Sequence, residues 1–137
     1  DTTIDGWLVG KKGTGAPASY LVVYGTSLAV DLSTGNYFEA DFEVATGTVM
    51  NLSFTENWRP YPASGPSTFI LKVIQGSTAR QFDWSNSRTY APFIHWPGGS
   101  GNGPTLSTTN NAVHILSFTT WDTGSSWYGK ILGQNFQ

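Results

Sequence analysis

The feature that most limits what this chain can fold into is an alternation of apolar and polar residues with a period of two. In the clearest run, four apolar residues alternate with three acidic ones: Phe38, Glu39, Ala40, Asp41, Phe42, Glu43 and Val44. Successive side chains of a strand point to opposite faces, so this run predicts a strand with one buried and one solvated face. No stretch of a dozen residues keeps the i, i+3, i+4 spacing of an amphipathic helix. The pattern therefore predicts an all-β protein.

Turn signals divide the rest of the chain into further short strands. Residues 50–54 alternate after Thr46-Gly47, which predicts a hairpin with residues 38–44. A turn at residues 75–77 predicts that residues 79–84 return antiparallel to residues 68–75. Other expected strands cover residues 7–9, 20–24, 92–96, 112–121 and 126–132. We expect an antiparallel β-sandwich, jelly-roll-like, of about seven to eight short strands. Residues 28–137 would form this domain, and residues 1–27 a lead-in segment or edge strands.

The composition fits one domain and excludes several partners. The chain has 137 residues, of which 15% are aromatic and only 12% are charged, with a net charge of −2. Its seven basic residues are scattered, which argues against a nucleic-acid or membrane-surface partner. It has no cysteine, so disulfides and thiolate chemistry are excluded. The first residue is Asp1 rather than Met, from which we expect a fragment or a processed product.

The residues that usually carry catalysis or bind metals are not grouped in this sequence. Glu39, Asp41 and Glu43 follow one strand face, which is typical of a solvent-facing strand. His95 and His114 each lie between apolar neighbours, and alternation places each on the face opposite those neighbours. The glycine-rich residues 98–103 lack the Lys-Ser/Thr ending of a phosphate-binding loop. We expect no enzyme, no cofactor and no metal site.

Aromatic residues in two expected loops are the candidate contact residues. They stand beside arginines in the proline-rich segment 56–66 and in segment 84–92: Trp58, Arg59, Tyr61, Arg88 and Tyr90. Flat rings stack on sugars and Arg binds hydroxyls, so the set suits glycan recognition. The alternative is that these rings pack under the loops or between subunits. Trp96, Trp121 and Trp127, at strand ends, are expected in the core or in an interface.

The C-terminal half resembles a known family. It contains Trp96-Pro97-Gly98-Gly99, then Pro104-Thr105-Leu106, then residues 111–122 (NAVHILSFTTWD), and finally Trp127-Tyr128-Gly129. This order is similar to the terminal domains of bacteriophage tail fibres and related virion appendage proteins, over residues 28–136. His114 replaces an Asp that is frequent in the family, and residues 123–126 replace its usual turn. The resemblance implies a β-sandwich module in a phage particle, commonly trimeric, with no catalytic residue.

The resemblance and the composition leave three functions open. The first is a virion fibre or appendage protein that forms a homo-oligomer, meets other virion proteins and contacts a host surface glycan. The second is a head-fibre, decoration or connector protein without receptor binding. The third is a stand-alone carbohydrate-binding module. A glycan depolymerase would need two carboxylates in a groove, and the sequence nominates no such pair.

Overall fold

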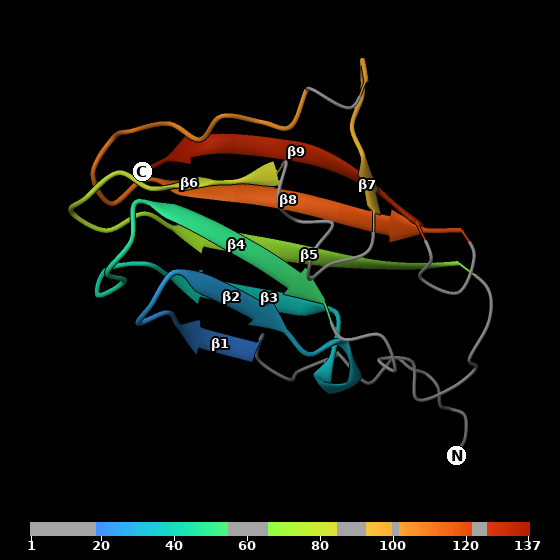
Figure 1. Cartoon of the computed structure of the whole chain (residues 1–137), viewed down its shortest axis with the longest axis horizontal. Coiled ribbons are helices and arrows are strands. Elements are labelled where there is room, and N and C mark those ends of the chain that lie inside the picture. Colours follow the sequence, from blue (N-terminus) through green and yellow to red (C-terminus); the bar gives the residue numbers. More distant parts are fainter. Residues whose placement is uncertain (1–18, 55–65, 85–92, 100–101, 122–125) are drawn as a thin grey trace.

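The computed structural model describes residues 19–54, 66–84, 93–99, 102–121 and 126–137 (Figure 1). These residues form nine strands and one short 3-10 helix, so the all-β prediction is confirmed. The strands are β1 (Ser19–Val22), β2 (Ser27–Val30), β3 (Tyr37–Asp41), β4 (Val49–Phe54), β5 (Ser67–Ile74), β6 (Gln81–Phe82), β7 (Phe93–His95), β8 (Val113–Thr120) and β9 (Ser126–Phe136). The helix, η1, covers Leu32–Thr34. The described residues thus hold nine strands where about seven or eight were expected, and β2 is the strand that the sequence analysis did not predict.

The strands form two mixed sheets. One has six strands in the order β1-β3-β5-β8-β9-β7, and the other has three in the order β2-β4-β6. Five of the seven strand pairs in the described residues are parallel, and only β5–β8 and β8–β9 are antiparallel. The prediction of an antiparallel fold was therefore wrong. The physical reason is that the chain alternates between the two sheets from β1 to β6, so each sheet receives its strands in the same direction.

This alternation also overturns two local predictions. The expected hairpin of residues 38–44 with residues 50–54 does not form, because β3 and β4 belong to different sheets. Likewise, β6 does not return beside β5 but pairs in parallel with β4. The turn signals were real, but these turns carry the chain across to the other sheet. At the C-terminal end, β8 and β9 are antiparallel neighbours.

The crossings between the sheets are stacked on one another through backbone hydrogen bonds. Val23 N donates to Asp41 O at 3.0 Å, and Phe42 N donates to Ile74 O at 3.0 Å. Thr46 N donates to Gly25 O at 3.3 Å, which joins the β3–β4 crossing to the β1–β2 crossing. Each crossing thereby satisfies backbone groups of the next, as buried polar groups require. From β1 to β6 the chain thus winds back and forth between the two sheets, and we call these six strands the wound part.

Arg80 holds these crossings from inside. Its side chain is only 5% exposed. Nε donates to Gly47 O at 2.9 Å, one terminal nitrogen to Thr78 O at 2.9 Å, and the other to Ala45 O. Gln75, fully buried, accepts from Arg80 N at 3.0 Å and donates to Arg80 O at 2.7 Å. A guanidinium has five fixed donors, which suits it to several carbonyls at once.

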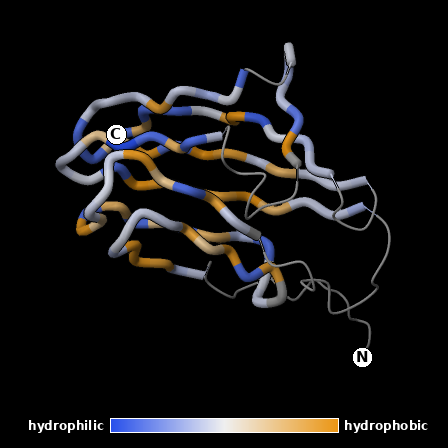
Figure 2. Tube along the Cα trace, viewed as in Figure 1, coloured by the Kyte–Doolittle hydropathy of each residue, from blue (hydrophilic) through white to orange (hydrophobic). Residues whose placement is uncertain are grey.

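The core lies between the two sheets, because side chains from both form a single hydrophobic cluster. Figure 2 shows the hydrophobic residues recurring along the central strands. Phe42, just after β3, meets Phe82 of β6 with ring centroids 5.7 Å apart. Phe69 on the central strand β5 packs on Phe118 at 5.0 Å and on Trp127 at 5.5 Å. Rings of this size fill much of a small core.

The residues that carry the family resemblance have structural roles. Trp96, 6% exposed, lies directly on Gly129, where an added Cβ would come within 2.6 Å of the indole ring. Gly98 and Gly99 turn the chain with φ of 88° and 125°, and Gly99 N donates to Trp96 O at 3.1 Å. Such positive φ values favour glycine. Trp127 is 1% exposed, so Trp96 and Trp127 lie in the core, as one of the two expectations had it.

Candidate functional site

The five contact residues nominated from the sequence cannot be placed. They are Trp58, Arg59, Tyr61, Arg88 and Tyr90, and all lie outside the described residues. Trp121, expected in the core or in an interface, is 68% exposed and so is not part of the core. The candidate surfaces are therefore those that the described strands present.

The histidines and acidic residues lie apart from one another. Within the described ranges, no group of three or more His, Cys, Asp or Glu residues could hold a metal ion. His95 of β7 stacks on Tyr128 with centroids 4.9 Å apart. Glu43, beyond the end of β3, accepts hydrogen bonds from Ser77 N at 3.1 Å and Ser77 Oγ at 3.2 Å. In the same part of the chain, no helix has the length and apolar character to cross a membrane.

His114 faces the interior although its neighbours in sequence face out. It is fully buried, whereas Val113 and Ile115 are partly exposed on the opposite face of β8. Nδ1 accepts a hydrogen bond from Asn135 N at 3.2 Å, which assigns the remaining proton to Nε2. Burial lowers the pKa of His114, because desolvation disfavours the charged ring; a backbone interaction with Ser107 opposes this shift. His114 is a neutral structural residue that joins β8 to the end of β9.

The first candidate surface is the outer face of the six-stranded sheet, here called the broad face. Alternation with the buried residues directs one side chain in two outward along each strand. One row of register-matched residues crosses five strands and is apolar apart from a single acid: Val22, Asp41, Ile74, Val113 and Phe136. Several of the large apolar residues on this face are well exposed: Tyr20 55%, Tyr37 56%, Tyr128 48%, Phe136 48% and Val22 39%. Exposed apolar residues gathered on one face mark interaction surfaces more often than scattered ones do.

Charged residues divide the broad face into two sides. Strand β3 carries Glu39 and Asp41, and β9 carries Lys130. Glu39 Oε1 lies 3.6 Å from Lys72 Nζ on the central strand β5. Tyr20 Oη donates to Asp41 Oδ2, and this hydrogen bond is the main reason that the pKa of Tyr20 is raised, with burial and the charges of Asp41 and Glu39 contributing. The side at β1 and β3 is acidic, and the side at β9 is basic.

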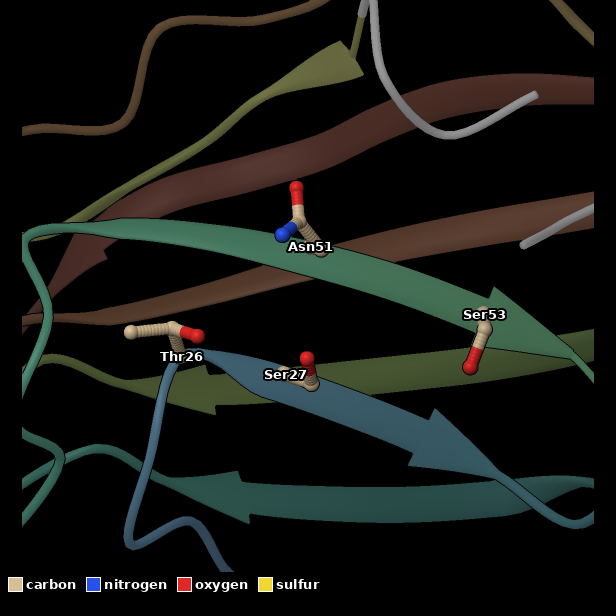
Figure 3. Close-up of a pocket in the computed structure, with 4 residues that line it drawn as sticks. All are labelled: Thr26, Ser27, Asn51 and Ser53. Atoms are coloured by element: carbon tan, nitrogen blue, oxygen red, sulfur yellow. The ribbon is translucent and has the colours of Figure 1, made fainter. Parts of the chain in front are cut away.

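The second candidate surface is a hollow of about 290 Å³ on the three-stranded sheet. Figure 3 shows its lining: Thr26 just before β2, Ser27 on β2, and Asn51 and Ser53 on β4. Ser27 and Asn51 are register partners in the parallel pair of β2 and β4. Three hydroxyls and one amide therefore stand on neighbouring strands around one space, which we call the polar hollow.

The side chains of the polar hollow are not used by the fold. Within the described ranges, none of the four has a side-chain hydrogen bond, and Asn51 Oδ1 is shielded from solvent without a partner. Buried polar atoms in native proteins normally have a partner, so an unused one calls for an explanation. Hydroxyl and amide groups left free around a hollow can bind a ligand that is rich in hydroxyls.

Sequence reasoning missed both surfaces. The polar hollow depends on β2, which was not predicted, and on the parallel register of β2 with β4. The broad face was partly visible, since the alternation of residues 38–44 identified Glu39 and Asp41 as outward residues. A strand over residues 20–24 was expected, with residues 1–27 as a lead-in or edge strands, but its pairing with β3 was not predicted, and that pairing brings Tyr20 and Val22 onto the same face.

Comparison of the chain with known proteins gives no match. No family model, no curated protein and no solved structure matches it.

Proposed function

We propose that this chain is a non-enzymatic module of a bacteriophage fibre or other virion appendage, which assembles as a homo-oligomer and contacts the host cell surface. Its partners would be further copies of itself, other virion proteins and a host surface glycan. The family resemblance favours a trimer. The same proposal includes the finer fold, a β-sandwich made by the two sheets, which their shared hydrophobic cluster supports.

The observation that carries the proposal is the broad face. A chain with only 12% charged residues places several large apolar side chains on one outer sheet face. Subunit interfaces are enriched in aromatic residues and depleted of charge at their centre, which matches the row from Val22 to Phe136. The motif residues Trp96 and Gly129 are consistent with the same proposal. They pack against each other inside the protein, so these two residues specify the scaffold and are not part of the broad face.

Solution mass tests this proposal. We expect light scattering to show an oligomer for the unaltered chain, and a monomer when Val22→Asp and Phe136→Asp are combined. Val49→Asp is the matched control, since Val49 is 51% exposed but lies on β4 of the other sheet. An unaltered chain that remains a monomer at all concentrations would contradict assembly.

The alternative of a decoration or connector protein shares the assembly but not the receptor. It differs in one measurement, the binding of the purified oligomer to host cells. Binding that free host glycan inhibits favours the appendage with a receptor, and an oligomer that ignores the cells favours the purely structural role.

A stand-alone carbohydrate-binding module is favoured by one specific observation, the polar hollow. Ser27 and Ser53 present hydroxyls to a space of about 290 Å³, large enough for part of a sugar. The test is titration of the monomeric chain with oligosaccharides. Ser27→Val should abolish binding, and Ser117→Val, on the broad face, should leave it unchanged. Equal binding by both variants would remove the hollow from consideration.

A further inference from the structure

The broad face carries opposite charge on two strands that cannot reach each other. Strand β3 is second from one edge of the six-stranded sheet, and β9 is second from the other edge. Three strand spacings separate them, or about 14 Å at roughly 4.8 Å each. Within the described ranges, Lys130 has no carboxylate within ion-pair distance, since the single ion pair there joins Lys72 to Glu39. Among the described residues, the acidic groups of β3 and Lys130 of β9 therefore make no ion pair with each other.

From β5 to β9 the row contains only apolar residues. Ile74 on β5 and Val113 on β8 are direct register partners, and Val113 is in turn paired with Phe136 on β9. A partner surface must therefore be apolar in the middle and must carry basic groups opposite β3 and acidic groups opposite β9. The broad face of another copy satisfies all these conditions when its basic side is placed against the acidic side of the first copy.

We propose that the partner of the broad face is a second copy of this chain, with the acidic side of one copy against the basic side of the next. Glu39 and Asp41 of one copy then lie near Lys130 of its neighbour, and the apolar rows are buried between the copies. This assignment rests on the proposed self-assembly. In a ring of three, each sheet forms one side of a prism, and its acidic edge meets the basic edge of the following copy.

Charge reversal tests the assignment. Lys130→Glu makes both sides of the face acidic, and Glu39→Lys makes the β3 side net basic when Lys72 is counted. Each single variant should dissociate at least about tenfold more readily than the unaltered oligomer, because like charges then meet across the contact. The double variant, Glu39→Lys with Lys130→Glu, restores opposite charges and should recover most of the assembly. Sedimentation at low and high salt measures all three, and salt should reduce the differences.

Mixing the two single variants then distinguishes a dimer from a ring of three. In a pair, the all-acidic face of one variant meets the basic face of the other, so mixing restores assembly. A ring of three cannot alternate two kinds of subunit, so mixing restores it only in part while the double variant restores it fully. Either result supports the charge rule, and the first replaces the trimer with a dimer.

The outcomes separate this inference from the proposal beneath it. If the unaltered chain is monomeric, self-assembly itself fails. If the unaltered chain is oligomeric but both single variants assemble as well as it does, self-assembly stands and the pairing of acidic with basic sides is wrong. Far-ultraviolet circular dichroism of each variant confirms that the sheets remain folded.

Discussion

The wound part of the molecule, β1 to β6, and the C-terminal part, β7 to β9, differ in how the chain connects neighbouring strands. In the wound part every strand pair is parallel, and consecutive strands lie in different sheets. In the C-terminal part, β8 and β9 are consecutive and antiparallel along most of their length. Parallel neighbours need a crossing connection, whereas antiparallel neighbours need only a turn.

The difference teaches where the stabilising polar contacts must lie. A tight turn between antiparallel strands can pair its own backbone N–H and C=O groups. The three stacked crossings, β1–β2, β3–β4 and β5–β6, instead present backbone carbonyls to the interior. Arg80 and Gln75 supply the missing donors in the wound part. In the C-terminal part the buried polar residues described are Thr120 and His114, and His114 accepts a hydrogen bond from Asn135 N. We therefore expect the wound part to depend more heavily on its polar residues.

The largest predicted effect is the loss of Arg80. Arg80→Met removes the donors to Ala45 O, Gly47 O and Thr78 O and leaves those carbonyls inside the protein. Hydrogen bonds from a charged group stabilise by about 1.5–3 kcal/mol each, so we expect the free energy of unfolding to fall by about 3 kcal/mol or more. Urea unfolding, followed by tryptophan fluorescence, measures the change.

Lys72→Met is the control for Arg80→Met. It also removes a cation, but one whose side chain is 43% exposed and paired only with Glu39 at 3.6 Å. An exposed ion pair contributes about 0–1 kcal/mol, so the loss should be small. Equal losses for the two variants would mean that Arg80 does not hold the crossings.

The two parts also differ in how well the sequence predicts them. Alternation located β3, β4, β5 and β8 correctly, because it reports which residues of a strand are buried. It could not tell which sheet a strand would join, since Thr46-Gly47 is an equally good signal for a hairpin and for a crossing. That choice depends on Arg80, which lies 33 residues from Gly47 and carries no local signal. The polar hollow was unpredictable for the same reason. Ser27 and Asn51 become neighbours only because the chain returns to the three-stranded sheet and pairs β2 with β4 in parallel.

The next effect concerns the glycine beneath Trp96 in the C-terminal part. Gly129→Ala places a Cβ within 2.6 Å of a rigid buried ring, so the indole or the strand must move. Overpacking of this kind costs about 1–3 kcal/mol. Gly25→Ala is the control, since nothing lies within 4 Å of its added Cβ. Thermal unfolding should separate the two variants, and equal melting temperatures would contradict the close contact.

A third prediction concerns the response of the C-terminal part to acid. The pKa of His114 is lowered in the folded protein, whereas in the unfolded chain it returns to its ordinary value near 6.5. Above that value neither state binds the proton and stability is at its full level. As the pH falls below it, the unfolded chain binds a proton that the folded protein does not, so stability decreases until the pH passes the folded pKa.

Unfolding at about pH 7.5 and at about pH 5.5 measures this response. His114→Gln removes the titrating ring and should flatten the difference between the two conditions. His95→Gln, which replaces the ring stacked on Tyr128, should retain it. A His114→Gln variant as sensitive to acid as the unaltered chain would assign the response to other groups.

The smallest predicted effect returns to the wound part, at Asn51. Its Oδ1 is shielded without a partner, so Asn51→Leu removes a desolvated acceptor and adds apolar area on a strand. We expect unfolding free energy to change by less than about 1 kcal/mol, in either direction, while any binding of oligosaccharide in the polar hollow is lost. Ser53→Ala, in the same hollow, controls for loss of a hydroxyl alone. A stability loss as large as that of Arg80→Met would show that Asn51 holds the crossings together and is not free for a ligand.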